Sequence, residues 1–179
     1  MTLAPHCILA IDAGETSGWA IGWHGKGTPH GVRIISGETH PLNAARVVEL
    51  ALRAAAAFPL IVVGERWTRH GMHAEAYGGL IAAWKAWTWA LEAAGHHPKR
   101  VVRVYPQSWR AAVLGRGNLR TEEARKLSIA VARGRWKLER EPGHDEAAAL
   151  CMLMWGMHAP EVEKAAAFKP RKIAPKGAP

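Results

Sequence analysis

The chain has 179 residues, of which 49% are hydrophobic, and this balance excludes an intrinsically disordered protein and fits one domain with a sizeable core. Lys and Arg number 24 against 15 Asp and Glu, which gives a formal net charge of +9. We therefore expect a polyanionic partner, because nucleic acids are bound largely through their phosphates. A surface that is basic only for solubility is the alternative.

The two cysteines, Cys7 and Cys151, both lie in apolar segments. Two buried thiols do not indicate a disulfide framework, so we expect a reducing compartment. The first residues lack the basic flank and the long apolar stretch of a signal peptide. No run reaches the roughly 20 apolar residues that span a bilayer. We therefore expect a soluble, cytoplasmic protein without a membrane partner.

The first forty residues predict three strands joined by short turns. "CILAID" over residues 7–12 is a short aliphatic run between a proline and a glycine. Residues 18–25 alternate large and small side chains, and residues 31–38 follow a turn rich in glycine. Alternation with a period of two and such turns are typical of hairpins. We therefore expect an antiparallel meander.

After the meander, helices and strands alternate. Helical periodicity predicts helices over residues 44–58, 74–94, 107–114, 121–132 and 145–157, with further strands over residues 60–65 and 100–105. This order predicts an α/β fold with a mixed five-stranded sheet, in which parallel strands extend the meander and helices flank both faces. We expect one domain over residues 1–159, because residues 160–179 lack periodicity and predict a flexible basic tail.

Two of the predicted strands end on an acidic residue, and a third acid begins the last helix. Asp12 ends the first strand, Glu65 ends the fourth, and Asp145 lies in the first turn of the helix. If the first and fourth strands are parallel neighbours, their carboxylates emerge at the edge of the sheet where α/β proteins bind ligands. The helix dipole also favours acids at helix starts, so Asp145 alone has a purely structural explanation.

Three clustered carboxylates repel one another unless a divalent cation neutralises them, and Mg²⁺ and Mn²⁺ prefer such oxygen ligands. Two ions about 4 Å apart can activate an attacking water and stabilise the leaving oxygen of a phosphodiester. We therefore predict metal-dependent phosphodiester cleavage. The alternative for the first strand is a phosphate cradle, in which Gly14 and Thr16 hold a nucleotide.

The segments "ILAIDAGETSGWAI", "IVVGERW", "YPQSWRAAVLGRG" and "GHDEAAALCMLMWG" follow one another in this order and cover most of residues 7–157. Together they resemble the RuvC family of Holliday-junction resolvases, in particular its compact bacteriophage-borne relatives. The resemblance implies an RNase H-like fold, a homodimer, two Mg²⁺ or Mn²⁺ ions per subunit, and paired cuts across a four-way DNA junction in a bacterial or phage-infected cell. It also implies that Asp12, Glu65 and Asp145 are the catalytic metal ligands.

Position 148 departs from this family pattern. The family's last helix carries a second acid three residues after the first, and here Ala148 stands in its place. Residues three apart share a helical face, so the missing carboxylate would have stood beside Asp145. Glu146 points about 100° away around the helix and substitutes poorly, whereas His144 could reach the metal ions. Either the protein manages with three acids or Ala148 is an inactivating change. The intact remainder of the pattern favours the second, in a chain that binds junctions better than it cuts them.

Basic and aromatic residues near these acids predict a DNA-binding surface. Trp67 follows Glu65 among cationic residues, and it could either stack on bases at the junction centre or pack against the long helix. The arginines around the Gly-rich loop at residues 115–120 could contact phosphates, with an ordinary solvated loop as the alternative. The predicted DNA-binding residues are Arg66, Trp67, Arg69, His70, Arg110, Arg116, Arg120, Arg125 and Lys126.

The helix over residues 74–94 is apolar on two faces. Trp84, Trp87 and Leu91 fall on one stripe, and Trp89 lies with several alanines on the opposite face. One apolar face would suffice for packing on the sheet, so the second face predicts a covering partner. We expect a homodimer with this helix at its two-fold axis, which suits a junction of near two-fold symmetry. A helix buried within one subunit is the alternative.

Three other functions stay open for this sequence. A non-catalytic junction-binding or nucleic-acid-binding protein could keep the fold and lack a metal ligand, as Ala148 permits. A nuclease of the same kind could act on structured RNA. Actin-like ATPases and sugar kinases also begin with a strand that reads Asp-x-Gly-x-Thr, but they clamp ATP between two such lobes, and this chain has room for one.

Overall fold

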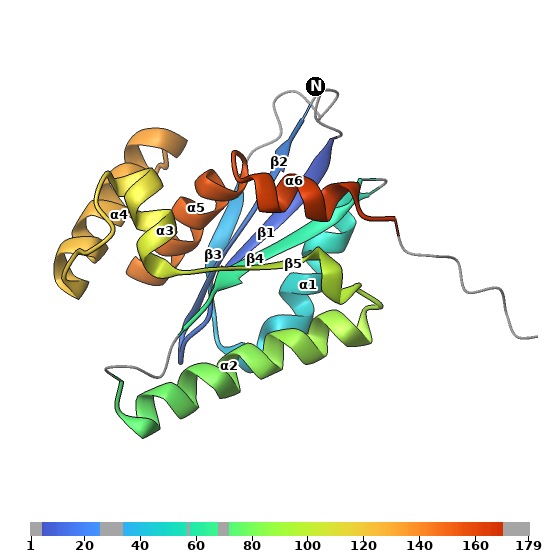
Figure 1. The fold of residues 1–179 in the computed structure, drawn as a ribbon, viewed down its shortest axis with the longest axis horizontal. Coiled ribbons are helices and arrows are strands. Elements are labelled where there is room, and N and C mark those ends of the chain that lie inside the picture. The colour runs from blue at the N-terminus through green and yellow to red at the C-terminus, as the bar shows by residue number, and fades with distance from the viewer. Residues whose placement is uncertain (1–4, 26–33, 57, 68–71, 170–179) are drawn as a thin grey trace, which may run out of the picture.

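The computed structural model describes residues 5–25, 34–56, 58–67 and 72–169. Within these ranges the strands form one sheet with the order β3-β2-β1-β4-β5 (Figure 1). Their bounds are β1 His6–Asp12, β2 Ser17–His24, β3 Ile35–Thr39, β4 Leu60–Glu65 and β5 Val101–Val104. β1, β2 and β3 pair antiparallel, whereas β4 and β5 continue the sheet parallel to β1. The predicted mixed five-stranded sheet is confirmed.

The helices follow the predicted order, with shifted ends. Their bounds are α1 Ala44–Ala55, α2 Ala74–Ala93, α3 Pro106–Leu114, α4 Thr121–Trp136, α5 His144–Gly156 and α6 Pro160–Ala167, with 3-10 turns η1 Pro41–Asn43 and η2 Pro98–Arg100. α1 ends three residues early because Ala56 takes a positive φ of 49°, and α4 runs one turn longer than predicted. Among the described helices, none combines the length and the apolar character that a membrane crossing requires.

Each face of the sheet is covered by its own set of helices. Ile8 and Ile61 point to the layer that contains α5, whereas Leu9 and Val62 point to α1 and α2. This separation follows from the period-two alternation of side chains along buried strands. Cys7 and Cys151 are buried free thiols, and burial raises the pKa of each to about 12. The prediction of buried free thiols is confirmed.

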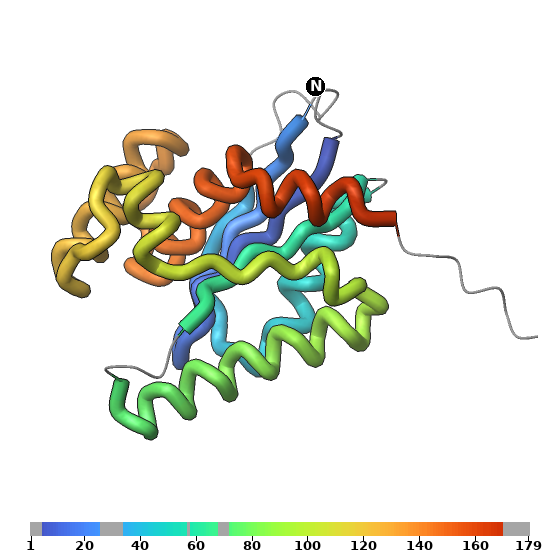
Figure 2. Tube along the Cα trace, viewed as in Figure 1, coloured from blue at the N-terminus to red at the C-terminus, as the bar shows by residue number. Residues whose placement is uncertain are grey.

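The predicted flexible tail over residues 160–179 is wrong for its first half. Residues 160–167 form α6, which lies across β4 and β5 (Figure 2), and Val162 is fully buried in the same core cluster as α5. The carbonyl oxygen of Phe168 accepts a hydrogen bond from Arg100. Only one side of α6 is apolar, and in so short a segment that pattern is weak. Residues 170–179 lie outside the described residues.

Candidate metal and nucleic-acid site

The strand pairing places Asp12 and Glu65 side by side. β1 and β4 are parallel neighbours, with Ile11 opposite Gly64, so the next residue of each strand is a carboxylate at the same edge of the sheet. By the alternation along each strand, both side chains lie on the face that α5 covers. The prediction that these two strands are parallel neighbours is confirmed.

Gly18 brings the third acid to the same edge. Gly18 of β2 lies opposite Asp12, and Glu38 of β3 lies opposite Gly18, so one row of residues crosses the sheet. A methyl group added at Gly18 would overlap the main-chain carbonyl of Asp145. Only glycine therefore lets the start of α5 lie this close to the strand, and Asp145 joins the row beside Asp12.

The start of α5 is tied to β3 by a network of charged and polar groups. Glu146 is 2% exposed and accepts hydrogen bonds from Ser36 Oγ at 2.7 Å and Arg140 Nη2 at 2.8 Å, while Arg140 Nη1 lies 2.8 Å from its other oxygen. Glu38 Oε1 accepts the main-chain N–H of Glu146 at 3.2 Å. Glu146 thus turns toward β3, in agreement with the prediction that it does not replace the acid missing at position 148.

A cavity of about 1280 Å³ opens at this end of the sheet. Its floor carries the predicted ligand residues and their neighbours: Asp12, Glu65, His144, Asp145 and Ala148. The end of β4 and the first turns of α2 form one wall, and the segment from α3 to α4 forms the other. His144 Nε2 lies 2.9 Å from Asp145 Oδ1, so the imidazole sits at the cavity beside the third acid.

The three acids resist ionisation in the absence of a cation. Burial raises the pKa of Asp12 well above its usual range, and the neighbouring Glu65 and Asp145 raise it further, against the opposing effect of Arg110 and Arg125. Burial also raises the pKa of Glu65 and of Asp145. A charge buried among like charges is unfavourable unless an ion of opposite sign neutralises it.

This donor set fits a hard divalent cation. Carboxylate oxygens are the ligands that Mg²⁺ and Mn²⁺ prefer, and such ions usually keep several waters, for which the cavity has room. Among the described residues, no group of three or more His, Cys, Asp or Glu side chains stands in an arrangement that could already hold a metal ion. The three carboxylates line one cavity, so a bound ion would have to draw them together.

The predicted DNA-binding residues divide into three groups. Those that line the cavity are Arg66, Trp67, Arg110, Arg120 and Arg125. Arg116 and Lys126 lie instead around a separate shallow hollow of about 430 Å³, which Arg120 also borders. Arg116 pairs there with Glu123 at 2.7 Å, so part of the predicted positive charge is neutralised within the protein. Arg69 and His70 lie outside the described residues.

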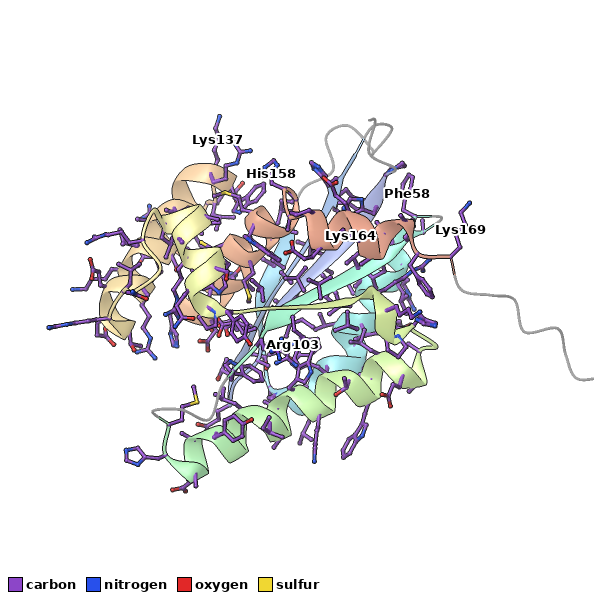
Figure 3. The ribbon with its side chains drawn as sticks, viewed as in Figure 1. Phe58, Arg103, Lys137, His158, Lys164 and Lys169 are labelled. Carbon is purple, nitrogen blue, oxygen red and sulfur yellow. The ribbon has the colours of Figure 1, made fainter. Side chains whose placement is uncertain are left out.

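Trp67 packs in the way that the second interpretation predicts. Its ring meets Trp84 of α2 edge-on, with centroids 6.3 Å apart, and the Arg103 guanidinium lies 4.8 Å from its centroid. Arg103 is also 4.0 Å from the Trp84 ring, which places it between β5 and α2 (Figure 3). Trp67 Nε1 donates a hydrogen bond to Glu65 Oε2 at 3.2 Å. The half-buried indole is therefore held against the protein rather than projected into solvent.

The turn after β1 uses one of its main-chain donors internally. The N–H of Gly14 donates to Ser17 Oγ at 3.4 Å, and Ser17 Oγ also accepts the indole N–H of Trp87 at 3.1 Å. The main-chain N–H of Gly14 is thus bonded inside the turn. This geometry favours the metal interpretation of Asp12 over the nucleotide interpretation.

α2 keeps an uncovered apolar face. Trp84, Trp87 and Leu91 are buried against the sheet, whereas Trp89 is 68% exposed on the opposite side. Leu42, in the 3-10 turn that packs near α2, is 83% exposed. A large exposed indole costs solvation energy, so this face suits contact with another surface.

Several residues of the site were missed by sequence reasoning. Trp109 is 1% exposed and donates its indole N–H to Glu65 Oε1 at 2.7 Å. Glu38 stands in the row with Asp12, and Tyr105 lines the cavity with Arg66 stacked 5.0 Å from its ring. The predicted hairpin already placed Gly18 and Glu38 on adjacent strands. That pairing could have identified Glu38 as a member of the row that contains Asp12. Nothing in the sequence pairs Trp109 with Glu65.

Sheet and site together define an RNase H-like α/β fold, with acids at the ends of its first and fourth strands and at the start of a helix packed across them. The structure of Thermus thermophilus RuvC is similar, with a TM-score of 0.53 and 21% sequence identity over 82% of this chain and 90% of that one. T. thermophilus RuvC in complex with Holliday junction substrate matches with a TM-score of 0.54 and 19% identity over 82% of this chain and 89% of that one. No protein-family model matches the sequence, and neither does any curated protein. The predicted RNase H-like fold is confirmed.

Proposed function

We propose that the chain is a RuvC-family, structure-selective endonuclease that resolves four-way DNA junctions by paired, metal-dependent hydrolysis of phosphodiesters. The observation that carries this proposal is the meeting of Asp12, Glu65 and Asp145 at one cavity with an arginine-bearing wall. The fold shared with RuvC, one structure of which holds a Holliday junction substrate, supports the choice of substrate.

Asp12, Glu65 and Asp145 would hold two Mg²⁺ or Mn²⁺ ions, with His144 close enough to join them. When bound, such ions activate the attacking water and stabilise the leaving oxygen. Arg110 and Arg125 line the same cavity and would hold the phosphodiester against the carboxylates. The remaining basic residues along α3 and α4 would contact phosphates of the adjoining DNA arm, and this contact would make binding depend on salt.

Ala148 lines the cavity one helical turn after Asp145, so an acid at this position would face the same ions. Because Ala148 carries no carboxylate, the second ion would have fewer protein ligands. We therefore expect tight junction binding with weak cleavage. A junction-binding protein without catalysis is the second candidate, and the short side chain of Ala148 at this place is the observation that favours it.

The exposed face of α2 supports a homodimer. A second copy could cover Trp89 across a two-fold axis and would set two active sites on one junction. Sedimentation at micromolar concentration should show a dimer, and Trp89→Glu should give a monomer with an unchanged circular dichroism spectrum. A monomeric native protein would contradict this arrangement.

Cleavage of a labelled synthetic four-way junction tests the proposal. We would compare the native chain with Ala148→Asp, each with Mg²⁺ and with Mn²⁺, and use Asp12→Asn in the Ala148→Asp background as the matched inactive control. The expected result is symmetric nicking that rises at least about tenfold in Ala148→Asp and is lost in the double variant, because even residues that only orient a metal ligand change activity by about 10- to 100-fold. Binding without cleavage in every variant would leave the non-catalytic function. Preferred cleavage of duplex RNA would redirect the proposal to an RNA substrate.

A further inference from the structure

Both carboxylate oxygens of Glu65 accept a hydrogen bond from an indole. Trp109 Nε1 donates to Oε1 at 2.7 Å, and Trp67 Nε1 donates to Oε2 at 3.2 Å. Glu65 is only 7% exposed, so water contributes little to its solvation. Because each oxygen has two lone pairs, one hydrogen bond to each leaves lone pairs free for a metal ion.

The two indoles are themselves fixed. Trp109 of α3 is 1% exposed and belongs to the core cluster that also contains the buried residues of α5. Trp67 lies against Arg103, which also stacks on Trp84 of α2. A Cβ added at Gly64 would come within 2.5 Å of the Trp84 ring, so the glycine beside Glu65 is what allows this stack to sit over the strand.

The main chain of Glu65 is held by the same stack. Arg103 Nε donates to the carbonyl oxygen of Glu65 at 2.7 Å, and its Nη2 donates to the same oxygen. The Arg103 guanidinium thus fixes the main chain of Glu65, whereas the Glu65 carboxylate accepts hydrogen bonds from neutral indoles. This division matters because a cation bonded directly to the carboxylate would repel a metal ion, whereas an indole orients the carboxylate and cannot ionise.

We propose that Trp109 and Trp67 are positioning residues, which hold the Glu65 carboxylate in the orientation that a divalent cation requires. The inference rests on the proposed function in that it takes Glu65 to be a metal ligand. It also assigns Trp67 to the support of the ligand rather than to insertion between bases. Groups that orient a metal ligand typically change metal affinity by 10- to 100-fold when they are removed.

Substitution by phenylalanine removes the indole N–H and keeps an aromatic ring. We would measure Mn²⁺ binding to metal-free protein by calorimetry for Trp109→Phe, Trp67→Phe and Trp23→Phe. Trp23 is the matched control, because its Nε1 donates to the main-chain carbonyl oxygen of Ala54 at 3.2 Å and not to Glu65. The expected result is Mn²⁺ affinity at least tenfold weaker for Trp109→Phe, a smaller loss for Trp67→Phe and no change for Trp23→Phe.

The indole N–H resonances supply a second measurement that needs no metal. Glu65→Gln replaces one accepting oxygen by an amide donor, so it should shift the Trp109 and Trp67 resonances of the metal-free protein and leave Trp23 in place. Titration of the native protein with Mg²⁺ should move the same two resonances. If Trp109→Phe does not fold, Trp67→Phe and these spectra carry the test.

The outcomes separate the two proposals. Native protein that binds Mn²⁺ with the same affinity as folded Trp109→Phe and Trp67→Phe would overturn the positioning role and leave the metal site standing. Indole resonances that ignore Glu65→Gln would overturn the role as well. Native protein that fails to bind Mn²⁺ at millimolar concentration would remove the proposed nuclease and the positioning role together.

Discussion

Glu65 and Asp145 face the same cavity, but the molecule holds them by opposite means. Glu65 stands at the end of a buried strand, where neutral indole donors grip both oxygens of its side chain. Asp145 stands at the start of a helix whose backbone is pinned against Gly18 and whose next residue is anchored by charged groups. Strand pairing fixes the Cα position of Glu65, so only its side chain still has to be oriented. Asp145 is in position only when the whole start of α5 is docked on the sheet. We therefore expect the position of Glu65 to be sensitive to loss of side-chain donors, and the position of Asp145 to be sensitive to loss of helix docking.

The largest effect is expected for Gly18→Ala, which should displace the start of α5 and with it Asp145. The added methyl group overlaps the carbonyl of Asp145, so we expect cleavage by the Ala148→Asp background to fall at least about 100-fold and stability to fall by about 1–3 kcal/mol, as for overpacking. Junction cleavage and urea denaturation measure the two effects.

The matched control is Gly134→Ala in α4, where nothing lies within 4 Å of an added Cβ. Alanine is the better helix former, so this variant should gain about 0.5–1 kcal/mol. A Gly18→Ala protein that kept both stability and cleavage would show that α5 is not placed by this contact.

The charged anchor gives the next largest effect. Arg140→Ala leaves Glu146 buried without its guanidinium partner, which destabilises the fold strongly when both groups are buried. Because the Arg140 side chain is 63% exposed, water replaces part of the interaction, and we expect a loss of about 1–2 kcal/mol. A double-mutant cycle with Glu146→Gln, read by urea denaturation, should recover most of this energy as coupling. Additive effects of the two substitutions would show that Arg140 does not stabilise the fold through Glu146.

A smaller and opposite effect is expected for Asp12→Asn in the metal-free protein. Burial, then Glu65 and Asp145, raises the pKa of Asp12, so the folded state binds this proton more tightly than the unfolded chain does. Stability is therefore lost as pH rises from the ordinary value of 3.8 toward the raised pKa, and the penalty vanishes as pH falls back toward 3.8.

Asp12→Asn should accordingly raise Tm by a few degrees at pH 8 without Mg²⁺ and give no gain at pH 4. Differential scanning calorimetry across this range measures it. Glu139→Gln, at an exposed position after α4, is the control and should change Tm at neither pH. A lower Tm for Asp12→Asn at pH 8 would mean that the carboxylates do not repel one another.

The smallest expected effect concerns Glu38, which caps α5 from a neighbouring strand. Glu38→Gln keeps an oxygen for the N–H of Glu146 and removes a charge from the helix start, so we expect a loss of about 0.5 kcal/mol. Glu38→Ala also removes the acceptor and should cost about 1 kcal/mol. Equal stabilities of both variants and the native protein in urea would show that the cap contributes nothing.

The sheet and its edge were predictable because they depend on local patterns. The alternation in β2 and the apolar runs that end in Asp12 and Glu65 report burial directly, and the connection rules of α/β folds then make β1 and β4 neighbours. The resemblance of the four segments to RuvC predicted the same fold. Asp145 could be placed near the other two acids by assuming that the helix predicted over residues 145–157 begins at the same end of the sheet.

What the sequence could not show depends on contacts between distant residues. Trp109 and Glu65 are 44 positions apart, and no spacing rule links an indole on one helix to a carboxylate on a strand. Trp67 beside arginines had two interpretations that only packing against Trp84 could separate. α6 was mistaken for a tail because the pairing of Val162 and Ala165 with the core is visible only once β4 and β5 are in place.

The position of α6 has a consequence for the order in which the protein is completed during synthesis. α6 covers one face of β4 and β5, and α5 covers β1 and β2 on the same face of the sheet. A ribosome delivers the other layer, with α1 and α2, long before these two. A nascent chain that ends before α5 therefore exposes this face of its sheet, so a chaperone that shields apolar strands should bind the chain when it is truncated before His144.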